Sequence, residues 1–193
     1  MLPGCRIFIY FSEFCTIITY SIASRFPPVS VNGWFKRLQL VSASWYSLGH
    51  GTNDAQKTMG VIALALFSSG MMSSFRIDVW VILAAHTAIA LGTLAGGWRI
   101  VRTMGHKITK LRPIDGFCAE SGGAAVLLGT AHFGIPVSTT HVIAGSIMGV
   151  GGSKKVSAVK WGVSRKILLA WILTIPISAF FAAVAFVLIR PLV

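Results

Sequence analysis

A short polar stretch, residues 49–58 (GHGTNDAQKT), combines residue types that suit the binding of ions. Its two glycines free the backbone for an irregular turn. Asn53, Asp54 and Thr58 then offer caps and oxygen ligands where a new helix would start. A helix N-terminus carries unpaired N–H groups and a partial positive charge, which suit an anion, whereas the Asp54 carboxylate suits a cation or a proton. The alternative is a plain polar loop in which Asn53 and Asp54 only cap the helix.

A second stretch, residues 134–141 (GIPVSTTH), has a similar character. Pro136 blocks the continuation of a preceding helix, and the hydroxyls of Ser138, Thr139 and Thr140 precede a new one. Hydroxyls and free N–H groups together form a neutral, donor-rich cradle that can hold an anion and still release it. The alternative is an ordinary Ser/Thr cap on a membrane helix.

Glu120 is the third candidate, because it lies near the start of an apolar segment. A carboxylate inside a membrane is functional by default. If the helix begins at Asp115, however, Glu120 lies little more than one turn inside it. Its carboxylate would then lie at the membrane interface and have a structural role, a favourable interaction with the helix dipole.

The composition decides where such residues must act. The chain has 193 residues, of which 54% are hydrophobic and 11% charged, with a net charge of +12. Soluble domains carry roughly 25% charged residues, so this composition argues strongly against a soluble enzyme. The basic residues stand in short tracts between apolar runs, which is the positive-inside pattern of membrane loops and not the pattern of a nucleic-acid binder. We therefore expect a multi-pass integral protein of the cell (inner or plasma) membrane.

Apolar runs predict the membrane helices. Residues 79–98 and 167–189 are uncharged and long enough to span the hydrocarbon, although the second contains Pro176. Residues 58–75 are slightly short, and residues 7–24 are a poorer candidate because Glu13 lies among them.

Two basic segments, residues 99–112 and 153–166, contain no acidic residue and are predicted to be cytoplasmic. The segment between them, residues 116–152, must then enter and leave the membrane on one side. Its second arm, residues 141–152, would give only about 18 Å of helix, so a re-entrant hairpin is predicted.

The earlier motif is predicted to have the same construction, with an apolar arm at residues 38–48 and a break at residues 49–54. Non-helical backbone at membrane depth is tolerated only where it lines a protein cavity or a water path. We therefore expect an all-α integral membrane protein with transmembrane helices and two broken or re-entrant helical hairpins. Two such breaks in one small protein indicate a transport site.

The spacing of the polar residues does not match the enzyme motifs that they could suggest. His50 and Asp54 have three residues between them, whereas the acyltransferase motif needs four, and residues 149–155 do not fit a phosphate-binding P-loop. Ser138 lacks a GxSxG context. No catalytic residue and no resident metal or cofactor is predicted.

Several motifs, in this order and spacing, resemble the PiT family of inorganic phosphate transporters. They are VNGWFKRLQLVSA (residues 31–43), GHGTNDAQKTMG (49–60), RPIDGFCAE (112–120) and GIPVSTTH (134–141). The resemblance covers residues 31–193. Residues 1–30 match nothing in the family and form an unplaced segment that could be a transmembrane helix.

The resemblance implies symport of inorganic phosphate with protons or sodium, with phosphate in some cases carried as a complex with a divalent metal. Carried over to this sequence, the phosphate ligands would be Asn53, Gln56, Thr58, Ser138, Thr139 and Thr140. The coupling ion would be bound by Asp54 and Glu120.

One departure is large. The family has two inverted halves, each with its own GxND and Ser-Thr motifs, whereas this chain has one copy of each and resembles the C-terminal half. Inverted repeats place the site at their interface, so a homodimer or a complementary N-terminal half is the expected partner, beside the lipid bilayer. The alternatives are a transport-inactive membrane fragment, an interaction partner, or a transporter of another oxyanion such as sulfate.

Overall fold

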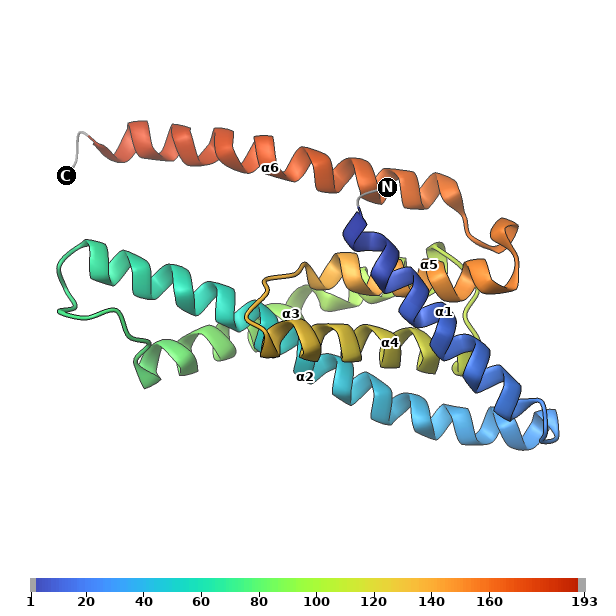
Figure 1. Ribbon diagram of the computed structural model, residues 1–193. Helices are drawn as coiled ribbons and strands as arrows, with labels where there is room; N and C mark the ends of the chain where they lie inside the picture. Colours follow the sequence, from blue (N-terminus) through green and yellow to red (C-terminus); the bar gives the residue numbers. More distant parts are fainter. Residues whose placement is uncertain (1–2, 191–193) are drawn as a thin grey trace.

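The computed structural model describes residues 3–190 and is built from helices (Figure 1). Among these residues there is no strand, so the prediction of an all-helical fold is confirmed. In chain order the helices are α1 (Pro3–Ala23), α2 (Pro28–Ser68), α3 (Val79–Lys107), α4 (Pro113–His132), α5 (Thr139–Lys154), the short 3₁₀ helix η1 (Val156–Ala158) and α6 (Trp161–Ile189).

Helices α4 and α5 form the central hairpin. Helix α4 ends at His132 and α5 begins at Thr139, so the predicted break around Pro136 is observed. The outer ends of the hairpin meet again, because the Lys160 N–H donates to the Ile108 carbonyl (2.9 Å) and the Thr109 hydroxyl donates to the Ala158 carbonyl (3.1 Å). The second arm has 16 residues, about 24 Å of helix, and is longer than predicted.

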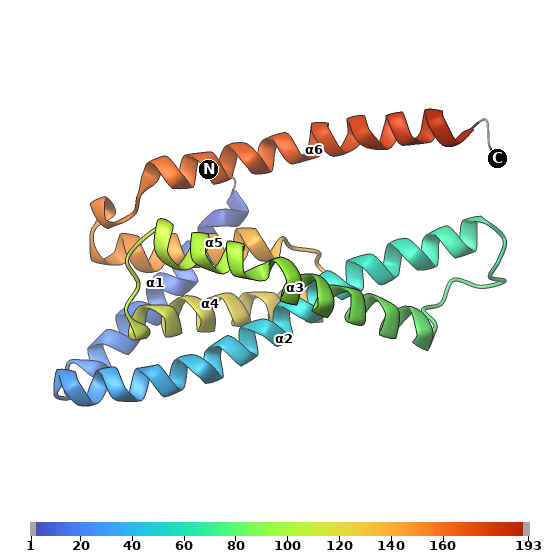
Figure 2. The same cartoon turned by 180° about the vertical axis from the view of Figure 1, so that it is seen from behind.

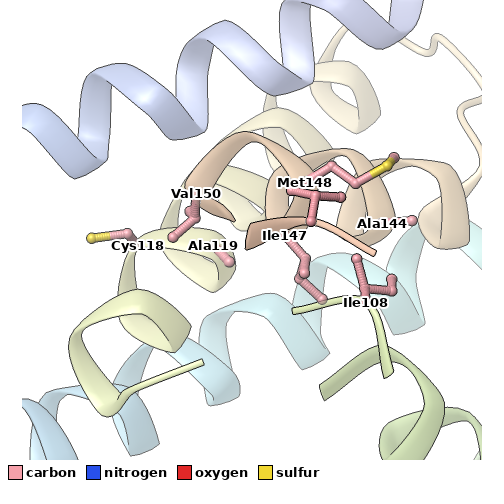
Figure 3. Close-up of a cluster of buried hydrophobic side chains, with 8 residues drawn as sticks. Ile108, Cys118, Ala119, Ala144, Ile147, Met148 and Val150 are labelled. Carbon is pink, nitrogen blue, oxygen red and sulfur yellow. The ribbon is translucent and has the colours of Figure 1, made fainter. Parts of the chain in front are cut away.

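The core of the hairpin is apolar and closely packed (Figure 3). Small and medium side chains from α4 and α5 interlock there with one residue from each flanking connector. The buried cluster consists of Ile108, Cys118, Ala119, Ala144, Ile147, Met148, Val150 and Val159.

Helix α1 crosses both arms of the hairpin, and an ionic cluster holds it there (Figures 1 and 2). Asp115, which is fully buried, accepts hydrogen bonds from the Tyr20 hydroxyl (2.7 Å), the Arg112 backbone N–H (2.7 Å) and the Lys154 ammonium. One carboxylate therefore caps α4 and links it to α1 and α5.

The predicted break at residues 49–54 is wrong. Helix α2 runs without interruption through this motif and bends along its length (Figure 1). The Thr52 hydroxyl bonds back to the Leu48 carbonyl (2.8 Å) within the helix. Gly49 provides a close approach to α4, since a Cβ there would lie 3.1 Å from the Cβ of Leu127. The glycine therefore serves helix packing and not a turn.

Among the described residues, two helices are long and apolar enough to cross a membrane, Val79–Trp98 within α3 and Trp161–Leu188 within α6. Both agree with predicted spans, and α6 continues through Pro176. The third predicted span, residues 58–75, is instead the end of α2 followed by a turn. Residues 7–24 form most of α1, which is not among the two candidates.

Gly51 tests the continuity of α2. Its φ is not positive, and a Cβ there would meet no atom within 4 Å. We expect Gly51→Ala to raise the free energy of unfolding by about 0.5–1 kcal/mol, because alanine is the better helix former. Gly49→Ala, the matched control, should show no such gain because its Cβ meets Leu127. Denaturation of the purified protein in detergent measures both, and a destabilising Gly51→Ala would argue for a broken helix.

The Asp115 cluster makes a second prediction. Asp115→Asn leaves the Lys154 ammonium without its carboxylate, and we expect a loss of about 3 kcal/mol in the free energy of unfolding. Asp78→Asn is the control, because its partner Arg76 is largely exposed, and it should cost less than about 1 kcal/mol. Equal effects of the two substitutions would show that the Asp115 cluster does not hold the bundle together.

Candidate functional site

One face of α2 carries the polar side chains that meet the hairpin. The Ser42 hydroxyl donates to Glu120 (2.6 Å), and the Tyr46 hydroxyl donates to the Thr139 carbonyl (2.9 Å). About two to four turns further along α2, Asp54 and Lys57 reach the residues that open α5. Spacings of three and four residues place these side chains on one side of a continuous helix.

Asp54 is the centre of the contacts between the two motifs. Its Oδ2 accepts a hydrogen bond from the Thr139 hydroxyl (3.2 Å) and lies 3.5 Å from His50 Nε2. Its Oδ1 lies 3.2 Å from Lys57 Nζ. The carboxylate is about one-third exposed, so an ion can reach it.

The opening of α5 presents the second half of the site. Gly134 adopts a positive φ of 66°, which ends α4 and turns the chain toward Pro136. Ser138 is the N-cap of α5, and its Oγ accepts a hydrogen bond from the His141 N–H (3.4 Å). Ser138 therefore acts as a helix cap, which is the alternative that the sequence left open beside an anion-binding cradle.

A small open cavity of about 180 Å³ lies between these two elements. The side of α2 contributes Asn53, Gln56 and Lys57, and the loop contributes Gly134, Ile135 and Pro136. Amide, ammonium and backbone groups around one small space suit an anion that must be bound and released.

The remaining predicted site residues lie apart from this cavity. Thr140 and Thr58 are exposed, and the Thr58 hydroxyl bonds to the Asp54 carbonyl within α2 (3.1 Å). Glu120 is bound to Ser42, which precedes Asp54 by about 18 Å along α2, so the two predicted ion-binding carboxylates lie apart. Among the described residues no three His, Cys, Asp or Glu side chains converge to hold a metal.

The prediction did not include Tyr46, His50 and Lys57 among the site residues. The four-residue spacing of Ser42, Tyr46 and His50, followed by Asp54, is visible in the sequence. This spacing places the side chains on one face only if residues 38–58 form one helix. Because a break was expected at residues 49–54, the pattern was not recognised.

An all-helical chain with two apolar, membrane-length helices and a polar site between helices is typical of membrane transport proteins. A family model described as the phosphate transporter family matches residues 12–182. The chain belongs to this family, which confirms the resemblance seen in its motifs.

Two relatives from bacteria carry the name "Probable low-affinity inorganic phosphate transporter". The protein of Rhizobium meliloti (strain 1021) is 57% identical over 160 residues, and that of Bacillus subtilis (strain 168) is 46% identical over 160 residues. Each alignment covers 82% of this chain and 48% of the relative. The chain therefore spans about half the length of these curated relatives. They are transporters and not enzymes, in agreement with the expectation.

The fold is also similar to a solved structure described as "The sodium-dependent phosphate transporter". The TM-score is 0.75 at 24% sequence identity, and the match covers 96% of this chain and 56% of the other. The likeness is one of fold, and it extends over α1, which the motif comparison left unplaced.

Tyr46 tests the link between α2 and the start of α5. Tyr46→Phe keeps the ring, which packs closely against Gly123, and removes only the hydrogen bond to the Thr139 carbonyl. We expect a loss of about 1 kcal/mol in the free energy of unfolding. Tyr10→Phe, at an exposed position of α1, should cause no change. If Tyr46→Phe were equally silent, the hydroxyl would not hold the site.

Proposed function

We propose that this chain forms one half of a permease for inorganic phosphate, working by secondary symport. The observation that carries the proposal is the hydrogen bond from the Thr139 hydroxyl to the Asp54 carboxylate. It joins the two family motifs, which are 85 residues apart in sequence, at one polar site beside a cavity. The family membership supports phosphate as the substrate.

Phosphate would bind between α2 and the N-terminus of α5. The first N–H groups of a helix have no carbonyl partner within it, and in α5 the Ser138 hydroxyl caps the one at His141. The helix dipole adds a partial positive charge there. The Asn53 and Gln56 amides line the adjacent cavity and supply further donors. Such donors hold a phosphate by hydrogen bonds and leave it free to dissociate, as transport requires.

The coupling ion, a proton or sodium, would bind at Asp54. A carboxylate beside the anion can take up a cation, which offsets part of the charge of phosphate as both cross the membrane. Glu120 remains a second candidate, at the separate contact between α2 and α4.

A second half is expected to complete the permease in the cell membrane. The chain spans about half the length of its relatives, and the end of α6, residues 172–188, is exposed throughout. Lipid and either a second copy of this chain or a complementary N-terminal half would cover these apolar surfaces. In this arrangement the α4–α5 hairpin is the re-entrant element at the interface of the halves.

Uptake of labelled phosphate into liposomes that contain this chain alone tests the proposal. We expect gradient-driven uptake that Asp54→Asn reduces at least tenfold, because the substitution removes the ionisable group that couples the two movements. Asp78→Asn, in the exposed turn after α2, is the matched control and should transport normally. Excess sulfate should not compete with phosphate.

An inserted, folded chain without uptake would contradict function as a homodimer, and adding a complementary half would then test the second arrangement. Uptake that survives Asp54→Asn, or that sulfate abolishes, would contradict the assigned ion site or the assigned substrate.

A further inference from the structure

Lys57 holds its ammonium group against the carboxylate that would bind the coupling ion. Its Nζ lies 3.2 Å from Asp54 Oδ1 and also donates to the Val137 carbonyl in the loop before α5. The two acceptors lie on different elements, so the ammonium connects α2 to the loop. This position is more restrained than that of an ordinary surface ion pair, in which both side chains move freely.

The oxygen atoms around this ammonium are those that a small hard cation would need. Hard cations bind carboxylate, hydroxyl and backbone carbonyl oxygens. Asp54 offers the carboxylate, Val137 the carbonyl, and Thr139 a hydroxyl that already touches Asp54. The lysine ammonium is a compact point charge with three donors, so it can take the place of such an ion.

The charges around Asp54 leave little attraction for another cation. Besides Lys57, the only other basic group that an observed contact brings to this carboxylate, among the described residues, is His50 at 3.5 Å. One carboxylate therefore faces one permanent positive charge and one imidazole. An added sodium ion would meet a net charge near zero and would have to displace the ammonium.

We propose that Lys57 is a built-in cation that occupies the alkali-ion position at Asp54 and excludes sodium from it. The inference rests on the proposed function in that it assumes Asp54 to be part of the transport site. It goes further by naming the residue that decides which ion this site accepts.

Thermal unfolding of the purified full chain in detergent tests the proposal without any measurement of transport. The probe is the melting temperature in NaCl compared with KCl and choline chloride at equal ionic strength. Wild-type protein should melt at the same temperature in all three salts. Lys57→Met, which keeps much of the side-chain length without the charge, should gain a sodium-specific rise of roughly 3 °C or more, because a ligand that binds only the folded state stabilises it.

Three further variants show whether the rise comes from this site. Lys57→Arg keeps the charge and should behave as wild type. The double variant Lys57→Met with Asp54→Asn should lose the sodium effect. Arg76→Met removes a cation from the exposed pair with Asp78 and should show no sodium effect, which controls for net charge.

Two results would overturn the proposal. One is a sodium-specific rise in the wild-type protein that Asp54→Asn abolishes, since sodium would then bind beside Lys57. The other is a folded Lys57→Met protein without any sodium effect, with Lys57→Gln as a second charge-free variant if the methionine variant does not fold. Failure of phosphate uptake alone would contradict the proposed function and leave these ion-binding results unaffected.

Discussion

The contacts of Asp54 and Lys57 with the loop that opens α5 are the interaction on which the candidate site depends. Helix α2 contributes the Asp54 carboxylate and the Lys57 ammonium. The carboxylate contacts the Thr139 hydroxyl at the start of α5, and the ammonium contacts the Val137 carbonyl in the preceding loop. The buried Thr139 hydroxyl needs a hydrogen-bond partner, and the partly exposed Asp54 carboxylate supplies it. The cavity lies beside these contacts, between the side of α2 and the loop.

Polar contacts hold both ends of the α4–α5 hairpin, and apolar packing holds its middle. At its tip the loop is bound to α2, and at its open end the Asp115 cluster binds α1, α4 and α5 together. Between them lie the small residues of the buried cluster, which allow the two helices to pack closely (Figure 3). Electrostatic links thus set where the hairpin sits, and apolar packing keeps its two arms together.

The outer surfaces of the molecule are strongly apolar. Leu94 and Trp98 of α3 and Ile175 of α6 are each more than three-quarters exposed. Exposed apolar area on this scale marks surfaces that meet lipid or another protein. The candidate site faces the hairpin, whereas these apolar side chains are exposed on α3 and α6, so the fold keeps the polar contacts apart from the apolar surfaces.

The sequence by itself determined the helical class, the apolar spans of α3 and α6, and the break before α5, because length, hydropathy and proline act locally. The pairing of Asp54 with Thr139 and the continuity of α2 were decided by tertiary structure. A glycine-rich polar stretch can form a turn or a helix, and at Gly49 the outcome depends on contact with Leu127 of α4. Lys57 likewise became part of the site only when the loop brought the Val137 carbonyl to it, since contacts between distant segments leave no periodic pattern in the sequence.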